Sequence, residues 1–280
     1  MIRLFSLIAL ACWAGTVGLT PLKAQEEQTL RVGLQALPPS LFNPYRNTGL
    51  PYVYTWSAVF DGLTSIDANG VLQPWLATSW ERIDPLTWVF ELRDDVTFSN
   101  GKPMTARAVV AAVEFLTSDD AKSETVARML RFLDSARVIG PHTVEIKTNR
   151  PTPLLPRFLP QLYVVEPDYF AAVGLEEFAQ APIATGPFMV EDIRPERMTL
   201  RAFKNAWRPA KVSRMDLLSL PEMSTRTMSI RAGSLDVAVG IGPDEVNTIV
   251  ADGGRKFSWR DAAIWAYHFI DGGHPAFADI

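Results

Sequence analysis

The chain has 280 residues, of which 48% are hydrophobic and 21% are charged, and its mean hydropathy is +0.05. This apolar content excludes a disordered protein, and charges spread along the whole sequence exclude a membrane protein with many spanning helices. The formal charge of −4 and the isoelectric point near 5.5 lack the basic excess typical of nucleic-acid-binding proteins, so we expect no nucleic-acid partner.

Residues 1–24 have the composition of a secretory signal peptide. A short positive start precedes an apolar stretch at 4–19, and Pro21 then ends this stretch shortly before a small residue, Ala24. One alternative is a retained membrane anchor, for which the stretch is short against the roughly 20 residues of a spanning helix. Another is a lipoprotein attached through Cys12, which lacks a leucine three residues before it. We therefore expect export to the periplasm and a mature chain without cysteine.

Alternating apolar residues and runs of β-branched and aromatic residues predict several strands. The predicted strands are 30–34, 62–66, 71–72, 87–92, 143–147 and 235–239. Asn69-Gly70 and Asn100-Gly101 are typical of the tight turns of β-hairpins. Residues 76–80 fit either a short helical turn or the start of a strand.

Helices are predicted where apolar residues recur at three- and four-residue spacing or where a capping residue precedes them. The predicted helices are 105–116, 128–133, a turn within 154–159, and 224–232. Thr105 and Ser224 are the expected N-caps of the first and the last, and Gly233 follows the last. Closely spaced prolines hold 37–45 in an extended loop. This mixture of elements predicts a mixed α/β (α+β) fold.

Catalytic and metal-binding patterns are weak. The three histidines have no metal-ligand spacing, so we expect neither a bound metal nor a cofactor. Ser99 and Lys102 match the Ser-x-x-Lys motif of acyl enzymes, but the Asn-Gly pair between them predicts a turn instead of the helix that this motif needs. We therefore expect that the protein is not an enzyme. The tryptophans beyond residue 24 are expected mainly in the core, with a few lining a ligand cleft.

Two stretches resemble a known family. Residues 60–103 contain Phe-Asp-Gly-Leu-Thr, Leu-Gln-Pro-Trp-Leu-Ala-Thr-Ser-Trp and Leu-Arg-Asp-Asp-Val-Thr-Phe-Ser-Asn-Gly-Lys-Pro, in that order. Residues 184–237 contain Ala-Thr-Gly-Pro-Phe, Lys-Asn-Ala-Trp and Arg-Ala-Gly-Ser-Leu-Asp-Val. This series is similar to that of the family 5 extracellular solute-binding proteins of ABC importers, which bind oligopeptides, dipeptides or nickel.

The resemblance implies a lobe like those of type 2 periplasmic binding proteins, with an appended subdomain. Residues 29–60 and 181–270 would form this first lobe, and residues 61–180 would form the subdomain. Family members are about twice as long, so residues 271–280 would begin the connection to a second lobe that this chain lacks. We expect the chain to be the first half of such a protein.

In function, the resemblance implies a periplasmic monomer that encloses a peptide or another small solute between two lobes. It would then deliver this solute to an ABC permease in the inner membrane. The ligand-binding residues expected in this half are Leu37, Pro38, Phe42, Trp56, Trp265 and Tyr267. Ordinary packing is the alternative for each of them.

Two other functions stay open. Binding of a nickel chelate is the alternative within the family, although residues 122–130 lack the tryptophan that nickel-binding members place against the chelate. A degenerate relative without a transport role is the alternative outside it.

Overall fold

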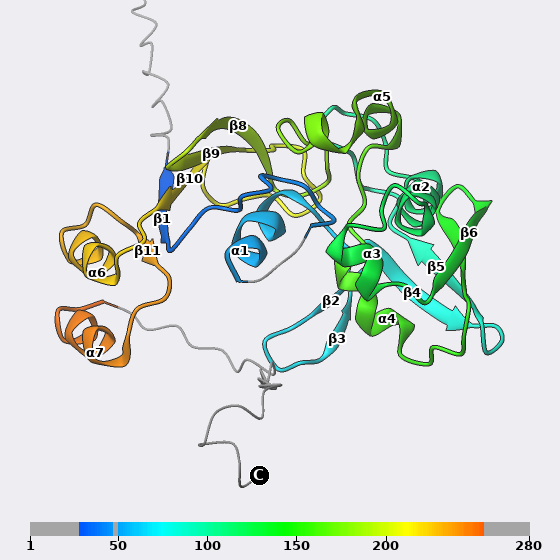
Figure 1. Cartoon of the computed structure of the whole chain (residues 1–280), viewed down its shortest axis with the longest axis horizontal. Helices are drawn as coiled ribbons and strands as arrows, with labels where there is room; N and C mark the ends of the chain where they lie inside the picture. Colours follow the sequence, from blue (N-terminus) through cyan, green and yellow to red (C-terminus); the bar gives the residue numbers. More distant parts are fainter. Residues whose placement is uncertain (1–27, 47–49, 255–280) are drawn as a thin grey trace, which may run out of the picture.

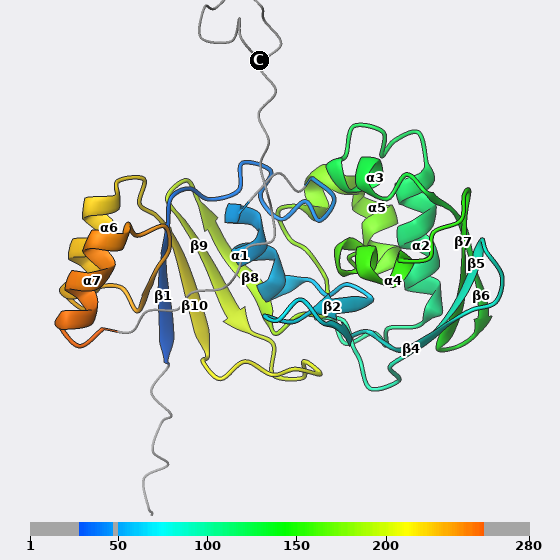
Figure 2. The same ribbon diagram turned by 90° about the horizontal axis from the view of Figure 1, so that it is seen from below.

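A computed structural model describes residues 28–46 and 50–254, and the predicted signal peptide lies outside them. A five-stranded sheet lies at one end of the molecule and a four-stranded sheet at the other (Figures 1 and 2). Helix α1 (Leu50–Val59) and the hairpin of β2 (Thr64–Ile66) and β3 (Leu72–Pro74) lie between the two sheets. The expectation of a mixed α/β fold is confirmed.

The five-stranded sheet combines segments from both ends of the described chain. Its strands, in spatial order, are β11 (Val237–Ala238), β1 (Thr29–Leu34), β10 (Arg214–Ser219), β9 (Arg197–Ala202) and β8 (Phe188–Arg194). β1 is parallel to both of its neighbours, whereas β9 is antiparallel to β8 and β10. Side chains of β1, β9 and α1 form one core with Phe178 and Phe188.

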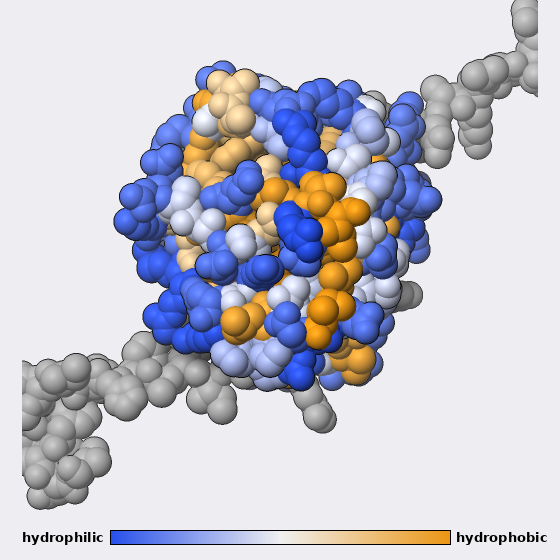
Figure 3. All heavy atoms as spheres, turned by 90° about the vertical axis from the view of Figure 1, so that its right-hand side faces the viewer, coloured by the Kyte–Doolittle hydropathy of each residue, from blue (hydrophilic) through white to orange (hydrophobic). Residues whose placement is uncertain are grey.

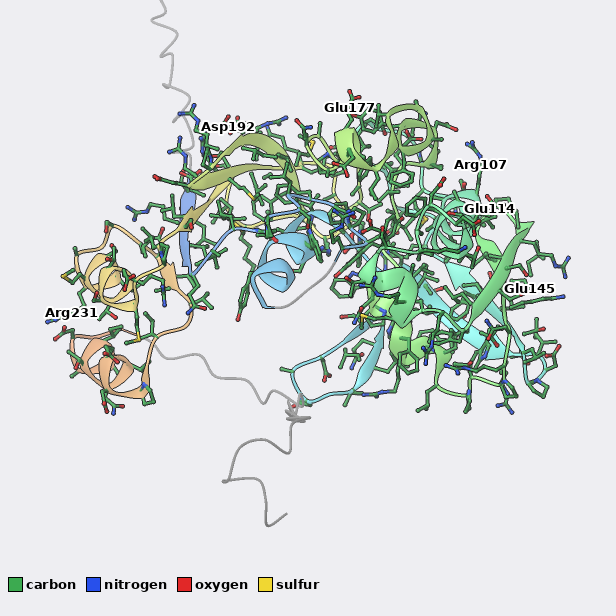
Figure 4. The ribbon with its side chains drawn as sticks, viewed as in Figure 1. Arg107, Glu114, Glu145, Glu177, Asp192 and Arg231 are labelled. Carbon is green, nitrogen blue, oxygen red and sulfur yellow. The ribbon has the colours of Figure 1, made fainter. Side chains whose placement is uncertain are left out.

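Helices α6 (Met223–Arg231) and α7 (Pro243–Ala251) lie at the β11 edge of this sheet (Figure 1). An ion pair between Arg231 and Asp252 joins them, and Figure 4 shows Arg231 at the outer end of the molecule. The sequence placed the start of α6 wrongly, because Glu222 and not Ser224 is its N-cap residue. The predicted end is confirmed, since Gly233 follows it with a φ of 71°.

The four-stranded sheet is antiparallel. Its order is β4 (Ala77–Arg82), β5 (Thr87–Leu92), β7 (Thr143–Thr148) and β6 (Leu133–Gly140). Helix α2 (Ala106–Thr117) covers one face with its predicted apolar stripe of Val109, Val113 and Leu116. The opposite face is polar, as an antiparallel sheet with one solvated face requires. There Glu145 pairs with Arg137 at 2.6 Å and points away from α2 (Figure 4).

Seen from this end, the surface is mixed: apolar side chains form a stripe that hydrophilic residues interrupt (Figure 3). Val138 and Ile139 of the edge strand β6 are exposed. None of the helices within the described residues is long and apolar enough to cross a bilayer.

The structure decides or corrects several local predictions. Residues 77–80 form the first part of the strand β4, so the strand alternative holds there. The helix predicted at 128–133 is wrong: α3 (Thr125–Met129) ends earlier, and a turn at 130–132 leads into the edge strand β6, which begins at the buried Leu133. Thr105 stands at the N-cap of α2, but its hydroxyl makes no capping hydrogen bond.

Both Asn-Gly turns are confirmed. Gly70 and Gly101 have φ values of 78° and 85°, in the left-handed region that glycine adopts without steric penalty. The first turn joins β2 to β3, with Asp67 accepting hydrogen bonds from two backbone N–H groups of the turn. At the second, Lys102 bonds to Glu166 and Asp168 instead of forming a pair with Ser99.

The remaining helices are short, apart from α5. The proline-rich section contains α4 (Leu155–Phe158) and a 3-10 turn (Leu159–Gln161), as the predicted helical turn within 154–159 required. Helix α5 (Pro167–Phe178) was not predicted. Its N-cap, Glu166, accepts hydrogen bonds from the N–H groups of Asp168 and Tyr169.

A buried carboxylate joins the two halves of the molecule. Asp61, only 1% exposed, follows α1 and accepts hydrogen bonds from Trp75 Nε1 at 2.7 Å and Thr185 Oγ1 at 2.8 Å. It also accepts from Trp207 Nε1 at 3.1 Å and Arg208 Nε at 2.7 Å. These five residues, which we call the Asp61 junction, come from motifs that the sequence places far apart.

Close backbone contacts surround the junction. A Cβ added to Gly62 would lie 2.4 Å from the carbonyl oxygen of Pro160, and one added to Gly186 would lie 2.4 Å from that of Val59. Real Cβ atoms do not approach backbone atoms so closely. The Asp-Gly and Thr-Gly-Pro sequences therefore place glycine where two backbone segments touch.

Candidate ligand-binding site

The carboxyl ends of four strands meet at one edge of the five-stranded sheet. β1, β10 and β11 are mutually parallel, and β8 runs in the same direction because both it and β10 are antiparallel to β9. Backbone hydrogen bonds tie the segments leaving this edge, with Leu220 N–H donating to Leu34 and Ser219 N–H donating to Glu196. In open sheets with parallel strands, ligands bind outside such carboxyl ends.

A hollow of about 460 Å³ lies at this edge, between the loop after β1 and the turn from β8 to β9. Its lining combines apolar side chains with a few polar ones: Ala36, Leu37, Pro38, Pro39, Leu41, Ile193, Arg194, Pro195, Met198 and Ser219. A second hollow of about 500 Å³ adjoins it around 194–197 and 218–220. Both volumes are in the range of small-ligand sites, and we call the pair the sheet-edge site.

The structure separates the predicted ligand-binding residues into three groups. Leu37 and Pro38 line the sheet-edge site. Phe42 and Trp56 are both 0% exposed and pack in the core, where the Trp56 ring centre lies 6.1 Å from that of Tyr163. Trp265 and Tyr267 lie outside the described residues. Ile193, Met198 and Ser219 were missed, because no local pattern shows that segments about 160 residues further along the chain reach this loop.

Leu41 has a φ of 52°, the left-handed region that a side chain with a Cβ rarely adopts. Its N–H donates to Pro38 at 3.0 Å, and the N–H of Asn43 donates to Ser40 at 3.0 Å, so two tight turns follow one another. Such a conformation costs roughly 1–2 kcal/mol and persists only where surrounding contacts enforce it. The loop is therefore held in one shape beside the hollow.

Buried Glu124 fixes the far end of this loop. Its carboxylate, 1% exposed, accepts hydrogen bonds from Asn43 Nδ2 at 3.2 Å and from Arg46 at 2.6 and 3.2 Å. Asn43 Oδ1 in turn accepts the N–H of Tyr45 at 2.9 Å, and the N–H of Val126 donates to the Tyr45 carbonyl at 2.9 Å. The loop is thus attached to α3, in the other half of the molecule.

We expect Glu124→Gln to lower the free energy of unfolding by about 1.5–3 kcal/mol, because charge-assisted hydrogen bonds to Arg46 and Asn43 are lost in a buried place. Amide exchange of Tyr45 and Val126 should accelerate, which hydrogen–deuterium exchange can measure. Glu114→Gln is the matched control, since Glu114 is an exposed residue on α2 (Figure 4). Equal exchange rates in both variants would contradict the role of Glu124.

A second support lies under the sheet edge. Arg226 of α6 is 1% exposed, and its guanidinium donates to four backbone carbonyls, those of Leu220, Pro221, Val239 and Gly240. It therefore holds together the segments that leave β10 and β11. No local pattern predicts this role for Arg226, because an arginine within a polar helix is normally a solvated side chain.

Three further side chains have pKa values that their surroundings shift. Arg107 and Lys102 hold the pKa of Asp168 well below its usual range, at about 2, through charge-assisted hydrogen bonds. Burial raises the pKa of Tyr163 to about 12 and that of Tyr45 still further, so both phenols are neutral at physiological pH.

No group of three or more His, Cys, Asp or Glu side chains within 28–46 and 50–254 is arranged to hold a metal ion.

Comparison with known proteins identifies the family. The sequence model described as "Bacterial extracellular solute-binding proteins, family 5 Middle" matches residues 71–280, which is most of the chain. The protein belongs to the family 5 extracellular solute-binding proteins. The members of this family bind solutes and are not enzymes.

Three relatives illustrate its range. The chain is 28% identical over 222 residues to the nickel-binding periplasmic protein of Escherichia coli, covering 75% of this chain and 40% of that one. It is 37% identical over 134 residues to the periplasmic oligopeptide-binding protein OppA of Haemophilus influenzae, covering 46% and 24%. It is 29% identical over 147 residues to the transcriptional regulator SgrR of Pectobacterium atrosepticum, covering 52% and 25%.

The fold is also similar to that of solved structures. OppA of Burkholderia pseudomallei superimposes with a TM-score of 0.72 at 24% sequence identity, covering 81% of this chain and 48% of that protein. The fold is therefore that of type 2 periplasmic binding proteins. The chain spans less than half the length of the relatives that it matches.

Proposed function

We propose that this chain is part of the extracytoplasmic substrate-binding component of an ABC importer, and that its substrates are peptides. Residues 29–60 and 181–270 would form the first lobe, and 61–180 the appended subdomain. A signal peptide at 1–24 would direct export to the periplasm. The protein would act there as a monomer that passes its ligand to a permease in the inner membrane.

The observation that carries this proposal is the sheet-edge site. Its walls are mainly apolar side chains and prolines, suited to the side chains of a peptide, and Arg194, which pairs with Asp192 at 2.7 Å, adds a polar group to the lining. The strained Leu41 loop keeps this wall in one shape, which lowers the entropy lost on binding. The identity with the oligopeptide-binding protein of H. influenzae supports peptides as the ligand class.

A titration followed by tryptophan fluorescence tests the proposal. We expect tripeptides to change the fluorescence of the protein, and Leu37→Ser to weaken this binding because Leu37 lines the site. Val71→Ser is the matched control, since Val71 is exposed on the β2–β3 hairpin. Binding of a nickel–histidine chelate without any binding of peptides would reverse the assignment.

Two other functions have support from relatives. The similarity to the nickel-binding protein of E. coli extends over more residues than the similarity to OppA, so a nickel chelate is the second candidate within transport. The similarity to SgrR supports a non-transport relative. Gene neighbourhood distinguishes the last case, because permease and ATPase genes beside this gene would favour transport.

A further inference from the structure

An apolar groove rimmed by arginines lies away from the sheet-edge site. It has a volume of about 410 Å³ and is lined by residues at the end of α3, in the segment 150–154 and in α4. Three large apolar side chains on it are exposed, Met129 at 47%, Leu154 at 57% and Phe158 at 44%. The Phe158 ring rests against Phe132, with ring centres 5.2 Å apart. We call this feature the arginine groove.

Three guanidinium groups border the groove, from Arg128, Arg131 and Arg150. Within 28–46 and 50–254, none of the three forms an ion pair, although Arg128 donates a hydrogen bond to the Ser123 carbonyl. By contrast, four arginines of the two sheets each pair with a nearby carboxylate: Arg31, Arg137, Arg194 and Arg214. A cluster of like charges without counter-charges is therefore concentrated around exposed apolar surface.

The proposed function does not use this place. No residue that lines the arginine groove also lines the sheet-edge site. The groove is lined by residues of α3 and α4, which Figure 2 shows on the side of the four-stranded sheet, whereas the sheet-edge site is lined by segments of the five-stranded sheet. The arginine groove therefore suits a partner other than the transported solute.

We propose that the arginine groove docks a segment of a partner protein in which large apolar side chains are flanked by carboxylates. Methionine, phenylalanine and arginine are enriched in the centres of protein interfaces, and exposed apolar surface gains free energy when it is covered. Each guanidinium can bind a carboxylate with two parallel hydrogen bonds, which a lysine cannot reproduce. The complementary charge also steers the acidic segment toward the groove.

Fluorescence anisotropy with labelled peptides tests this proposal on the full chain. The probe is Glu-Asp-Phe-Leu-Asp-Glu, and its two controls replace either all four acidic residues with lysine or both apolar residues with serine. We expect binding of the probe alone. The double variant Arg131→Gln, Arg150→Gln should weaken it at least tenfold, and Leu154→Ser should also weaken it. Arg82→Gln, which removes an exposed arginine of β4, should leave it unchanged.

Several outcomes would overturn the proposal. The first is that the probe does not bind. The second is that the control peptides bind as tightly as the probe. The third is that the double variant binds the probe with the same affinity as the unchanged protein. Two more results would assign the groove to another occupant and equally overturn it. One is binding of phosphatidylglycerol vesicles, but not of the probe, that the double variant abolishes; the other is a dimer in sedimentation that the double variant separates. Circular dichroism of each variant checks that it is folded.

Discussion

Asp61→Asn should lower the free energy of unfolding by about 3–5 kcal/mol, the loss typical of breaking a buried ion pair on one side. The substitution keeps the shape of the side chain but removes its charge and turns one acceptor into a donor. Arg208 would lose its counter-charge, and one of the indole N–H groups or the Thr185 hydroxyl would face an N–H group. Urea unfolding followed by tryptophan fluorescence measures the change.

The matched control is Asp94→Asn, because Asp94 is exposed and makes no ion pair in the described part of the chain. We expect it to change stability by less than about 0.5 kcal/mol, as is usual at the surface. The slope of the unfolding transition should stay the same in both variants if only the native state is affected. A similar midpoint for the two proteins would show that the Asp61 junction does not stabilise the fold.

Gly186→Ala should destabilise the protein by about 3 kcal/mol or more, at the upper end of the penalties for overpacking. The new Cβ would lie 2.4 Å from the Val59 carbonyl oxygen and 2.9 Å from that of Ala58, and both are backbone atoms of α1. Relieving these contacts would require α1 to move away from the segment that leads into β8. The hydrogen bond from the Gly186 N–H to the Val59 carbonyl would then break. Thermal unfolding and soluble yield report the effect.

Gly140→Ala separates this close contact from a general effect of glycine replacement. Its added Cβ would lie 3.1 Å from Thr143 Oγ1, the end of a side chain that can rotate away. We expect a change within about 1 kcal/mol. If Gly186→Ala were tolerated as well as Gly140→Ala, the tight approach between α1 and the Thr-Gly-Pro segment would not limit stability.

Local features of the fold were predictable because local chemistry determines them. The turns at Asn69-Gly70 and Asn100-Gly101 need a left-handed residue, and the apolar stripe of α2 needs only helical spacing. The helix at 128–133 failed because α3 ends at Met129 and Leu133 already pairs with Thr148 of β7 in the edge strand β6. Tertiary packing there overrides local preference.

Only one wall of the sheet-edge site was predictable from the sequence. Prolines marked the loop that contains Leu37 and Pro38, but the opposite wall comes from β8 and β9, whose position beside β1 depends on sheet pairing. In the same way, no local pattern identifies Glu124 as the buried partner of Arg46, which lies 78 residues earlier in the chain. Pairings of this kind depend on long-range topology, which residue spacing within one segment does not encode.

The Asp61 junction also sets an order for folding. Arg208, its last member along the chain, lies 147 residues after Asp61. Closing a loop of this length has a large entropic penalty that nearby contacts must offset, so the junction is completed late. Until Arg208 reaches Asp61, this carboxylate has no counter-charge. The joint between the two halves of the molecule is therefore completed only after contacts within each half have formed.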